Sequence, residues 1–393
     1  MRVTLRQTGR ERVDMAQAFV ASAPLKAARG LAMHRLSAEG ISLAIESRGG
    51  MLAELVIDYD GRRLAPLHRA PWVGAPGEVP ADAAPHLAVL EGDFFCAPFG
   101  RTDDPEVPAH GWPANGHWQL GGIDVGADGA RTGRFELAER VQGAVLTKEV
   151  TLRPGHPVVY QRHVLRGGSG RIPIAHHAMI RVPGGARLSF SPKDFGATPA
   201  TPQESDPARG RSLLAYPQRF ATLADVGLAD GSRRDLRRYP WAEGQEDFLT
   251  LLDPPEARIG WSAAVAKLDG FVFFAVKDAG ILCQTSLWMS NGGRSYAPWS
   301  SRHRAVLGIE ETCAHFGDGP GVSGGDNDLT RAGYRTAVAL GGRLDVRYAL
   351  GAIPVPDGWS EVAAVELAAD GLVLADVAGG RAVVPFDRDF LHG

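Results

Sequence analysis

The sequence predicts an all-β protein built as one large antiparallel β-sandwich. Three observations lead there: short runs rich in Val, Ile, Leu and Phe, frequent turn residues between them, and little helical periodicity. The 393 residues include 49 glycines and 27 prolines, which is material for many tight connections between short strands. Sandwiches of this class often exceed the usual domain size, so the length does not require several domains.

From about Leu36 onward, apolar runs of strand length end at glycine, proline or aspartate. Turn pairs such as Asp60-Gly61 and Pro154-Gly155 follow directly. The pattern lacks the strand–helix alternation that builds a parallel sheet, so an α/β fold is disfavoured. The runs that we expect to be strands include residues 41–46, 52–59, 144–152, 158–165 and 271–276.

The chain shows no fixed-period repeat, no low-complexity linker and no sharp compositional break. We therefore expect an N-terminal extension over residues 1–35, the sandwich over 36–355, and a β-hairpin appendage of the same domain over 356–393. The stretch 191–210 contains four prolines, which preclude long elements. We interpret it as a surface loop at a cleft wall.

The charge pattern limits the classes of partner. The formal net charge is −3, and no Lys/Arg cluster combines with aromatic residues as a nucleic-acid groove requires. No apolar run approaches the roughly 18 residues that cross a bilayer. We expect a small-molecule ligand, no nucleic-acid or membrane partner, and a monomer or homodimer.

Cysteine usage bears on the compartment. Cys96, Cys283 and Cys313 are too few and too scattered for a disulfide framework, and none forms a CxxC spacing. The mildly apolar segment 15–23 has charged flanks that fit a secretory signal poorly. A reducing, cytoplasmic location is the expectation.

Residues 91–101 and 110–118 concentrate residue types that packing does not need. Sugars present apolar faces that stack on indole rings and hydroxyls that need hydrogen-bond partners, so Trp with His and Asn suits them. Trp118 is at least as well explained as a core anchor. His110 is the better binding candidate, because the following glycine allows close approach of backbone and ligand. The binding candidates in this region are Arg101, His110, Trp112 and Asn115.

A second segment, residues 172–185, contains the adjacent pair His176 and His177. Side chains alternate along a strand, so at most one of the two faces a given cleft. Such a pair is a poor bidentate metal site by itself, and we expect no metal.

The third segment carries Trp288 and Asn291, followed by Glu310 at the end of the apolar run 305–309. A carboxylate at the end of such a strand lies where a pleated sheet borders a binding cleft. Taken alone, Glu310 and Glu311 are better explained as a solvated acidic pair at a strand end.

In this order, the segments resemble the galactose-mutarotase-like, or aldose 1-epimerase, superfamily over about residues 36–350. GDFFCAPFG…HGWPANGHW is similar to the Gly-Pro-Phe stretch and HG…N..W block of the hexose-6-phosphate mutarotase branch. IPIAHHAMIRVPGG is similar to the strand with the catalytic histidine, and VLGIEE to the late strand with the catalytic glutamate.

The resemblance implies a mutarotase that opens and recloses a sugar ring without a cofactor. It implies Glu310 as general base and His177 as general acid, with His176 the alternative histidine. Asp247 stands where relatives often have a hydroxyl-binding aspartate. The binding candidates that complete this set are His110, Trp112, Asn115, Arg101, Trp288 and Asn291.

The chain departs from the phosphate-specific branch at two positions. Glu91 and Ala114 stand where that branch has arginines, which favours a neutral or mildly polar sugar over a sugar phosphate, although Arg101 could compensate. Two other functions stay open: a carbohydrate-binding protein without turnover, and a polysaccharide lyase or glycosidase. Enzymes of the last group usually add a helical domain, which no segment predicts.

Overall fold

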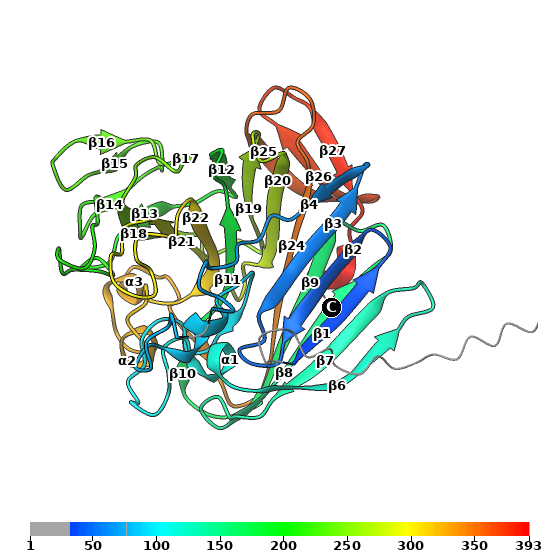
Figure 1. The fold of residues 1–393 in the computed structure, drawn as a ribbon, viewed down its shortest axis with the longest axis horizontal. Helices are drawn as coiled ribbons and strands as arrows, with labels where there is room; N and C mark the ends of the chain where they lie inside the picture. Colours follow the sequence, from blue (N-terminus) through cyan, green and yellow to red (C-terminus); the bar gives the residue numbers. More distant parts are fainter. Residues whose placement is uncertain (1–31, 76, 393) are drawn as a thin grey trace, which may run out of the picture.

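The computed structural model describes residues 32–75 and 77–392 (Figure 1). The all-β prediction is confirmed, because strands far outnumber helices and neighbouring strands in the large sheets run antiparallel. Most of the expected N-terminal extension, residues 1–35, lies outside the described residues. The helical elements are α1 (Gly111–Asn115), α2 (Pro320–Gly324), α3 (Asp328–Arg331) and the 3-10 turns η1 (Pro85–Val89) and η2 (Arg388–Leu391).

The largest sheet has nine strands. Its order is β17 (Arg238–Tyr239), β12 (Ala186–Phe190), β19 (Ile259–Ala266), β20 (Phe271–Asp278), β24 (Arg343–Pro354), β9 (Val158–Gly167), β8 (Ala144–Leu152), β7 (Arg131–Leu137) and β6 (Trp118–Val125). Short turns join successive strands, which the Gly and Pro content of the sequence allows.

The second sheet has seven strands and carries the segments of interest. Its order is β14 (Arg219–Phe220), β13 (Phe195–Ala197), β18 (Gln245–Leu252), β21 (Gln284–Asn291), β22 (Val306–Cys313), β11 (Ile174–Arg181) and β5 (Phe95–Cys96). Its central strands are buried on both faces, which explains why they read as nearly continuous apolar runs.

Smaller sheets cover what the two large ones leave open. A four-stranded sheet comprises β1 (Met33–Ala38), β2 (Ile41–Glu46), β3 (Leu52–Tyr59) and β4 (Arg62–Leu64). A three-stranded sheet stands where the sequence suggests a hairpin, comprising β25 (Val362–Ala368), β26 (Gly371–Asp376) and β27 (Arg381–Val384). Two ribbons pair β10 (Arg171–Ile172) with β23 (Val338–Ala339), and β15 (Val226–Gly227) with β16 (Arg233–Arg234).

The nine-stranded sheet is the central layer (Figure 1). Leu350 and Phe273 on its inner face share one apolar core with Leu287 of the seven-stranded sheet and Leu43 of the four-stranded sheet. Its other face packs against the C-terminal sheet through a second core. The seven-stranded sheet therefore has one face in the sandwich. Its other face, the free face, packs against loop residues such as Trp72 and Leu90 and not against another large sheet, which leaves room for a site.

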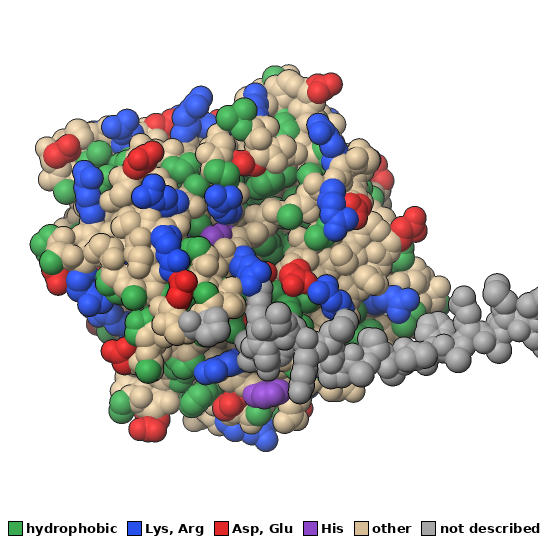
Figure 2. All heavy atoms as spheres, in the orientation of Figure 1, with side chains coloured by type: hydrophobic (Ala, Val, Ile, Leu, Met, Phe, Trp, Pro, Cys, Tyr) green, Lys and Arg blue, Asp and Glu red, His purple; other side chains and the backbone are tan. Residues whose placement is uncertain are grey.

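The visible surface carries charges of both signs (Figure 2). Figure 2 shows basic and acidic side chains interspersed over the visible face, without a single basic patch. In the part of the chain that the structure describes, no helix is long and apolar enough to cross a membrane.

A cluster of four charged side chains lies between the two large sheets. Lys277 of β20 reaches Glu311 of β22 at 2.6 Å and Asp253 at 2.8 Å. Lys193 also pairs with Asp253, and Thr285 donates a hydrogen bond to Glu311. The cluster has two positive and two negative charges, so its total charge is balanced inside the core.

Replacing Lys277 with Met should test this balance. The variant keeps side-chain length but leaves a buried negative charge uncompensated, which typically costs about 3–5 kcal/mol. Urea unfolding should show that loss, and adding Glu311→Gln should recover much of it because charges balance again. Equal stabilities of parent and Lys277→Met would contradict a structural role for the cluster.

Candidate active site

The free face of the seven-stranded sheet forms the floor of the site. Because side chains alternate along a strand, β11 points His176 into the sandwich and His177 to the free face. On β22, Glu311 lies in the sandwich and Glu310 on the free face. Trp288 of β21 lies beside them.

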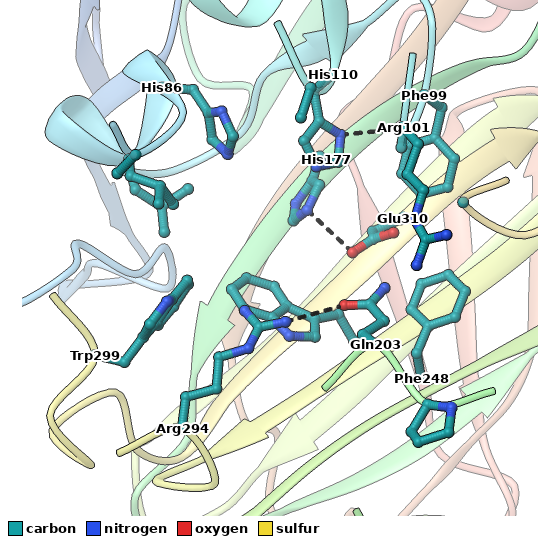
Figure 3. A pocket seen from close by; sticks show the side chains of 18 of the residues that line it. His86, Phe99, Arg101, His110, His177, Gln203, Phe248, Arg294, Trp299 and Glu310 are labelled. Atoms are coloured by element: carbon teal, nitrogen blue, oxygen red, sulfur yellow. Dashed lines mark hydrogen bonds and ion pairs between the residues drawn. The ribbon is translucent and has the colours of Figure 1, made fainter. Parts of the chain in front are cut away.

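A pocket of about 390 Å³ lies over this floor (Figure 3). Its walls are loops together with the 3-10 turn η1, and they come from residues 83–94, 99–110, 199–203, 294–299 and 317–318. The proline-rich stretch 191–210 therefore contributes a wall of the pocket. A sheet floor with loop walls gives a fixed base and a variable rim.

His177 and Glu310 form the central pair. They are directly opposite each other in the antiparallel register of β11 and β22, and His177 Nε2 lies 3.1 Å from Glu310 Oε1. Both side chains are buried. His177 Nδ1 and Glu310 Oε2 have no hydrogen-bond partner among the described residues, so each keeps a polar atom available to a ligand.

The local sequence makes room for this pair. A Cβ atom at Gly308 would lie 2.8 Å from Glu310 Oε1 and 3.1 Å from Trp288 Cβ, so a larger residue would displace one of them. On the other side, the ring of Phe94 stacks on His177 with centroids 4.5 Å apart. The imidazole is thus fixed between an aromatic ring and the carboxyl group.

Burial sets the protonation of the pair. Loss of water raises the pKa of Glu310 well above its ordinary value of 4.5. The same cause lowers the pKa of His177 from 6.5 to about 3. At a pH between the lowered pKa of His177 and the raised pKa of Glu310, the pair holds one proton. That proton can lie on either partner across the 3.1 Å contact.

Two more histidines continue from the pair along one wall. The ring of His110 lies 5.6 Å from His177 and 5.1 Å from His86, edge to face in both contacts. The Gly100 backbone N–H donates to His110 Nδ1, which leaves the His110 proton on Nε2. Burial lowers the pKa of His110 well below 6.5, and that of His86 to about 4, so both are neutral donors or acceptors.

A close backbone approach fixes His110. Gly111 has φ +72°, and a Cβ there would lie 2.1 Å from the Ala97 carbonyl oxygen. His110 itself has φ 65° at the start of α1. This left-handed pair of residues turns the chain so that the imidazole enters the pocket.

The opposite wall is held by a buried carboxylate. Glu246 accepts hydrogen bonds from Trp288 Nε1 and from Ser290 Oγ, and it lies 3.3 Å from Arg294 Nη1. The Arg294 guanidinium stacks on Trp299 at 4.7 Å from the ring centroid. Glu246 therefore positions both an indole and a guanidinium in the pocket.

Five of the sequence-predicted site residues line this pocket: His177, Glu310, His110, Arg101 and Trp288. They come from four separate segments of the chain, so the sheet and its loops bring them together. Their roles toward a sugar stay predictions.

Two others stand beside the pocket and support its wall. Asn115 Nδ2 donates to the carbonyl groups of Ala109 and Gly111, and its Oδ1 accepts from the His86 backbone N–H. Trp112 is half-buried and packs against the sandwich core. Neither side chain is part of the pocket lining.

The remaining three point elsewhere because of strand alternation or local bonding. His176 Nδ1 lies 3.1 Å from Asp93 Oδ2 inside the sandwich. Asp247 accepts hydrogen bonds from Leu213 N–H, Leu214 N–H and Tyr216 Oη, and burial raises its pKa to about 6. Asn291 bonds the backbone of Ala242 and Ala305. All three have structural partners outside the pocket lining.

The two positions that differ from the phosphate-specific branch also lie outside the pocket. Glu91 is buried, accepts from the Glu54 backbone N–H and pairs with Arg69 at 3.6 Å. Ala114 is fully buried in α1. Arginines at these two positions would not line this pocket as it is built, so their absence does not decide between free and phosphorylated sugars.

Sequence reasoning did not single out His86, Glu246, Arg294 or Trp299. Glu246 is adjacent to the predicted Asp247, and only the strand register tells which of the two faces the pocket. Arg294 follows Trp288 and Asn291 in the third segment. A charged residue directly after Gly292-Gly293 was a signal that could have marked it as a binding candidate. His86 lies in the short 3-10 turn η1 and Trp299 in a loop, and neither segment has a sequence pattern that marks it as part of a site.

Within the described residues, no three His, Cys, Asp or Glu side chains converge in a way that could hold a metal ion. The pocket lining instead offers imidazole nitrogens of His86 and His177 and one oxygen of Glu310 that have no hydrogen-bond partner among the described residues. Such a set suits hydroxyl groups and proton transfer.

Comparisons with known proteins concern the fold. No family model matches the chain, and no curated protein sequence matches it. A proposed aldose 1-epimerase from Escherichia coli K12 has a TM-score of 0.53 at 11% identity, covering 83% of this chain and 100% of that one. A proposed aldose 1-epimerase from Klebsiella pneumoniae has a TM-score of 0.51 at 16% identity, covering 83% and 80%.

A third similar structure shows that the fold occurs in a different setting. A TPR-domain containing protein from Parabacteroides distasonis has a TM-score of 0.51 at 12% identity, covering 86% of this chain and 50% of that chain.

The similarity to the two structures of proposed aldose 1-epimerases shows that the chain has the fold of the galactose-mutarotase-like, or aldose 1-epimerase, superfamily. The resemblance inferred from the sequence is thus confirmed at the level of fold. Function must be argued from the site.

The raised pKa of Glu310 predicts a pH-dependent stability. In the unfolded chain Glu310 ionises near 4.5, whereas the folded chain keeps its proton to higher pH. The folded state then holds the extra proton, so the free energy of unfolding falls as pH rises above 4.5, by about 1.4 kcal/mol per pH unit until the folded chain also ionises. Glu310→Gln removes this penalty and should be more stable than the parent at pH 8.

Thermal unfolding followed by circular dichroism at pH 5 to 8 would measure the difference, which should shrink as the pH falls. Glu366→Gln, at an exposed position of β25, is the matched control and should show no such trend. A parent protein as stable as Glu310→Gln throughout this range would contradict a buried, neutral Glu310.

Proposed function

We propose that this protein is an aldose 1-epimerase that interconverts the anomers of a free sugar. The observation that carries the proposal is the buried His177–Glu310 pair, 3.1 Å apart, with one unpartnered polar atom on each residue at a pocket of about 390 Å³. Trp288 and Trp299 supply flat apolar surfaces for the sugar ring.

Anomer exchange requires one proton to leave and another to arrive. A base removes the proton from the hydroxyl on C1, the C1–O5 bond breaks, and an acid protonates O5 to give the open-chain aldehyde. Rotation about C1–C2 and the reverse steps close the ring on the other face. We assign Glu310 as the base and His177 as the acid.

The shared proton accounts for both roles. Burial favours the neutral pair, and a sugar hydroxyl donating to Glu310 Oε2 favours the carboxylate, with the proton passing to His177 across their contact. The imidazolium then protonates O5 while the carboxylate takes the C1 proton. After ring closure the pair again holds one proton, so no cofactor is needed to balance the step.

The histidine wall would hold the sugar during ring opening. His110 has its proton on Nε2, and His86 Nδ1 has no hydrogen-bond partner among the described residues. His86 is buried and His110 is half-buried, and the lowered pKa of each keeps its ring neutral, so both can bind hydroxyl groups without competing for the catalytic proton. Oriented donors of this kind typically contribute a few kcal/mol in the transition state.

Hydrolysis of a glycosidic bond is less well supported. It requires a second carboxylate at a suitable separation from the first. Among the described residues that line the pocket, Asp318 is the other carboxylate, and it is held by His315 Nδ1 at 2.9 Å. A carbohydrate-binding role without turnover would use the same pocket, and kinetics distinguish it.

Glu310→Gln and His177→Asn should each slow mutarotation about 10²–10⁴-fold, the usual contribution of a general acid or base. Both changes keep a polar side chain, so sugar binding should weaken far less than turnover. Polarimetry or exchange NMR would give the rates, after subtraction of the spontaneous reaction, and calorimetry the affinities.

Glu366→Gln, at an exposed position of β25 outside the pocket lining, serves as the control and should keep its activity. If Glu310→Gln turns over as fast as the parent, Glu310 is not the base. If the parent binds sugars without accelerating anomer exchange, the protein is a binder.

A further inference from the structure

The pocket holds more positive than negative charge. Four of its lining residues carry an acidic or a guanidinium group: Arg101, Arg294, Glu310 and Asp318. His177 and Glu310 lie 3.1 Å apart, and burial favours the neutral form of each by lowering the pKa of His177 and raising that of Glu310. Asp318 is paired with His315, whose Nε2 also lies 2.7 Å from Asp328. The net charge of the pocket therefore depends on the two arginines.

Arg294 is already occupied. Its Nη1 lies 3.3 Å from Glu246 Oε1, its Nη2 donates to Gln203 Oε1 at 3.4 Å, and its guanidinium stacks on Trp299. These contacts come from the sheet, from the loop 199–203 and from the loop 294–299. Arg294 thus joins two walls to the floor.

Arg101 has no such partner. Among the described residues, no carboxylate lies within ion-pair distance of its guanidinium, although Asp318 lines the same pocket. Figure 3 shows the guanidinium reaching into the pocket between Phe99 and Phe248, on the side of Glu310. An arginine directed into a cavity without a counterion is suited to an anionic group on the ligand.

We propose that the sugar bound here carries a carboxylate, as a hexuronic acid does, and that Arg101 is the residue that selects it. The proposal rests on the mutarotase function proposed above. A hexuronate bears its carboxylate on C5, next to the ring oxygen, so capture of the carboxylate orients O5. The planar guanidinium can bind both carboxylate oxygens at once.

A carboxylate fits better than a phosphate group. The pocket offers one unpartnered guanidinium, which matches a planar anion of single charge. A phosphate monoester near neutral pH carries a charge between −1 and −2 and three acceptor oxygens, and it would need further donors. Arg294 cannot supply them without giving up its ion pair with Glu246, which is buried.

The test compares sugars that differ at C6 alone. Mutarotation of galacturonate, galactose and galactose 6-phosphate, and of the matching glucose series, is measured by exchange NMR on the parent, Arg101→Gln, Arg101→Lys and Arg62→Gln. Arg62 is exposed on β4 and outside the pocket. Calorimetry on the same sugars gives binding separately from turnover.

We expect kcat/KM for a uronate to exceed that for its neutral hexose by at least about tenfold. Arg101→Gln should remove this selectivity, Arg101→Lys should retain part of it, and Arg62→Gln should retain all of it. A ratio near one in the parent, a ratio that Arg101→Gln leaves intact, or a preference for the 6-phosphates would overturn the proposal.

Failure of the two proposals can be told apart. Turnover of neutral hexoses without preference for uronates contradicts the carboxylate proposal and leaves the mutarotase function standing. If no sugar is turned over, the mutarotase function fails. In that case uronate binding that Arg101→Gln abolishes still supports the carboxylate site, and absence of uronate binding contradicts it.

Discussion

The structure depends on the antiparallel register between β11 and β22. Main-chain hydrogen bonds set His177 opposite Glu310 and His176 opposite Glu311. Because side chains alternate along a strand, one pair faces the pocket and the other enters the sandwich. A slip of one residue would exchange the two faces. The register therefore fixes both the candidate acid–base pair and the polar contacts that join the two large sheets.

The ionisable groups on the two faces of the seven-stranded sheet differ in how many polar partners they have. Inside the sandwich, Glu311 is stabilised by Lys277, Ser262 and Thr285. On the pocket side, Glu310 has the imidazole of His177 as its polar partner and keeps Oε2 unpartnered among the described residues. A buried polar atom without a partner lowers stability. This cost is typical of sites that are arranged to bind a ligand.

Much of the fold could be predicted because the strands are local patterns. The expected ranges 41–46, 52–59 and 144–152 coincide with β2, β3 and β8. Alternation also correctly limited the His176–His177 pair to one residue per face. The pocket walls could not be predicted, since Arg294 enters from a loop and His86 from the 3-10 turn η1, and the positions of both depend on tertiary packing. The prediction for Asp247 rested on a weak motif match, which did not show which face of the strand its side chain occupies. In the structure Asp247 points away from the pocket and bonds the backbone of Leu213.

The two residues proposed as acid and base lie on paired strands, whereas most of the pocket wall lies on loops. The spacing of His177 and Glu310 is maintained by the backbone, independently of the loops at 199–203 and 294–299. Insertions or substitutions in those loops can change which ligand fits without moving His177 and Glu310 relative to each other. A change of ligand specificity therefore requires changes in the wall loops only, and the paired strands of the floor can stay as they are.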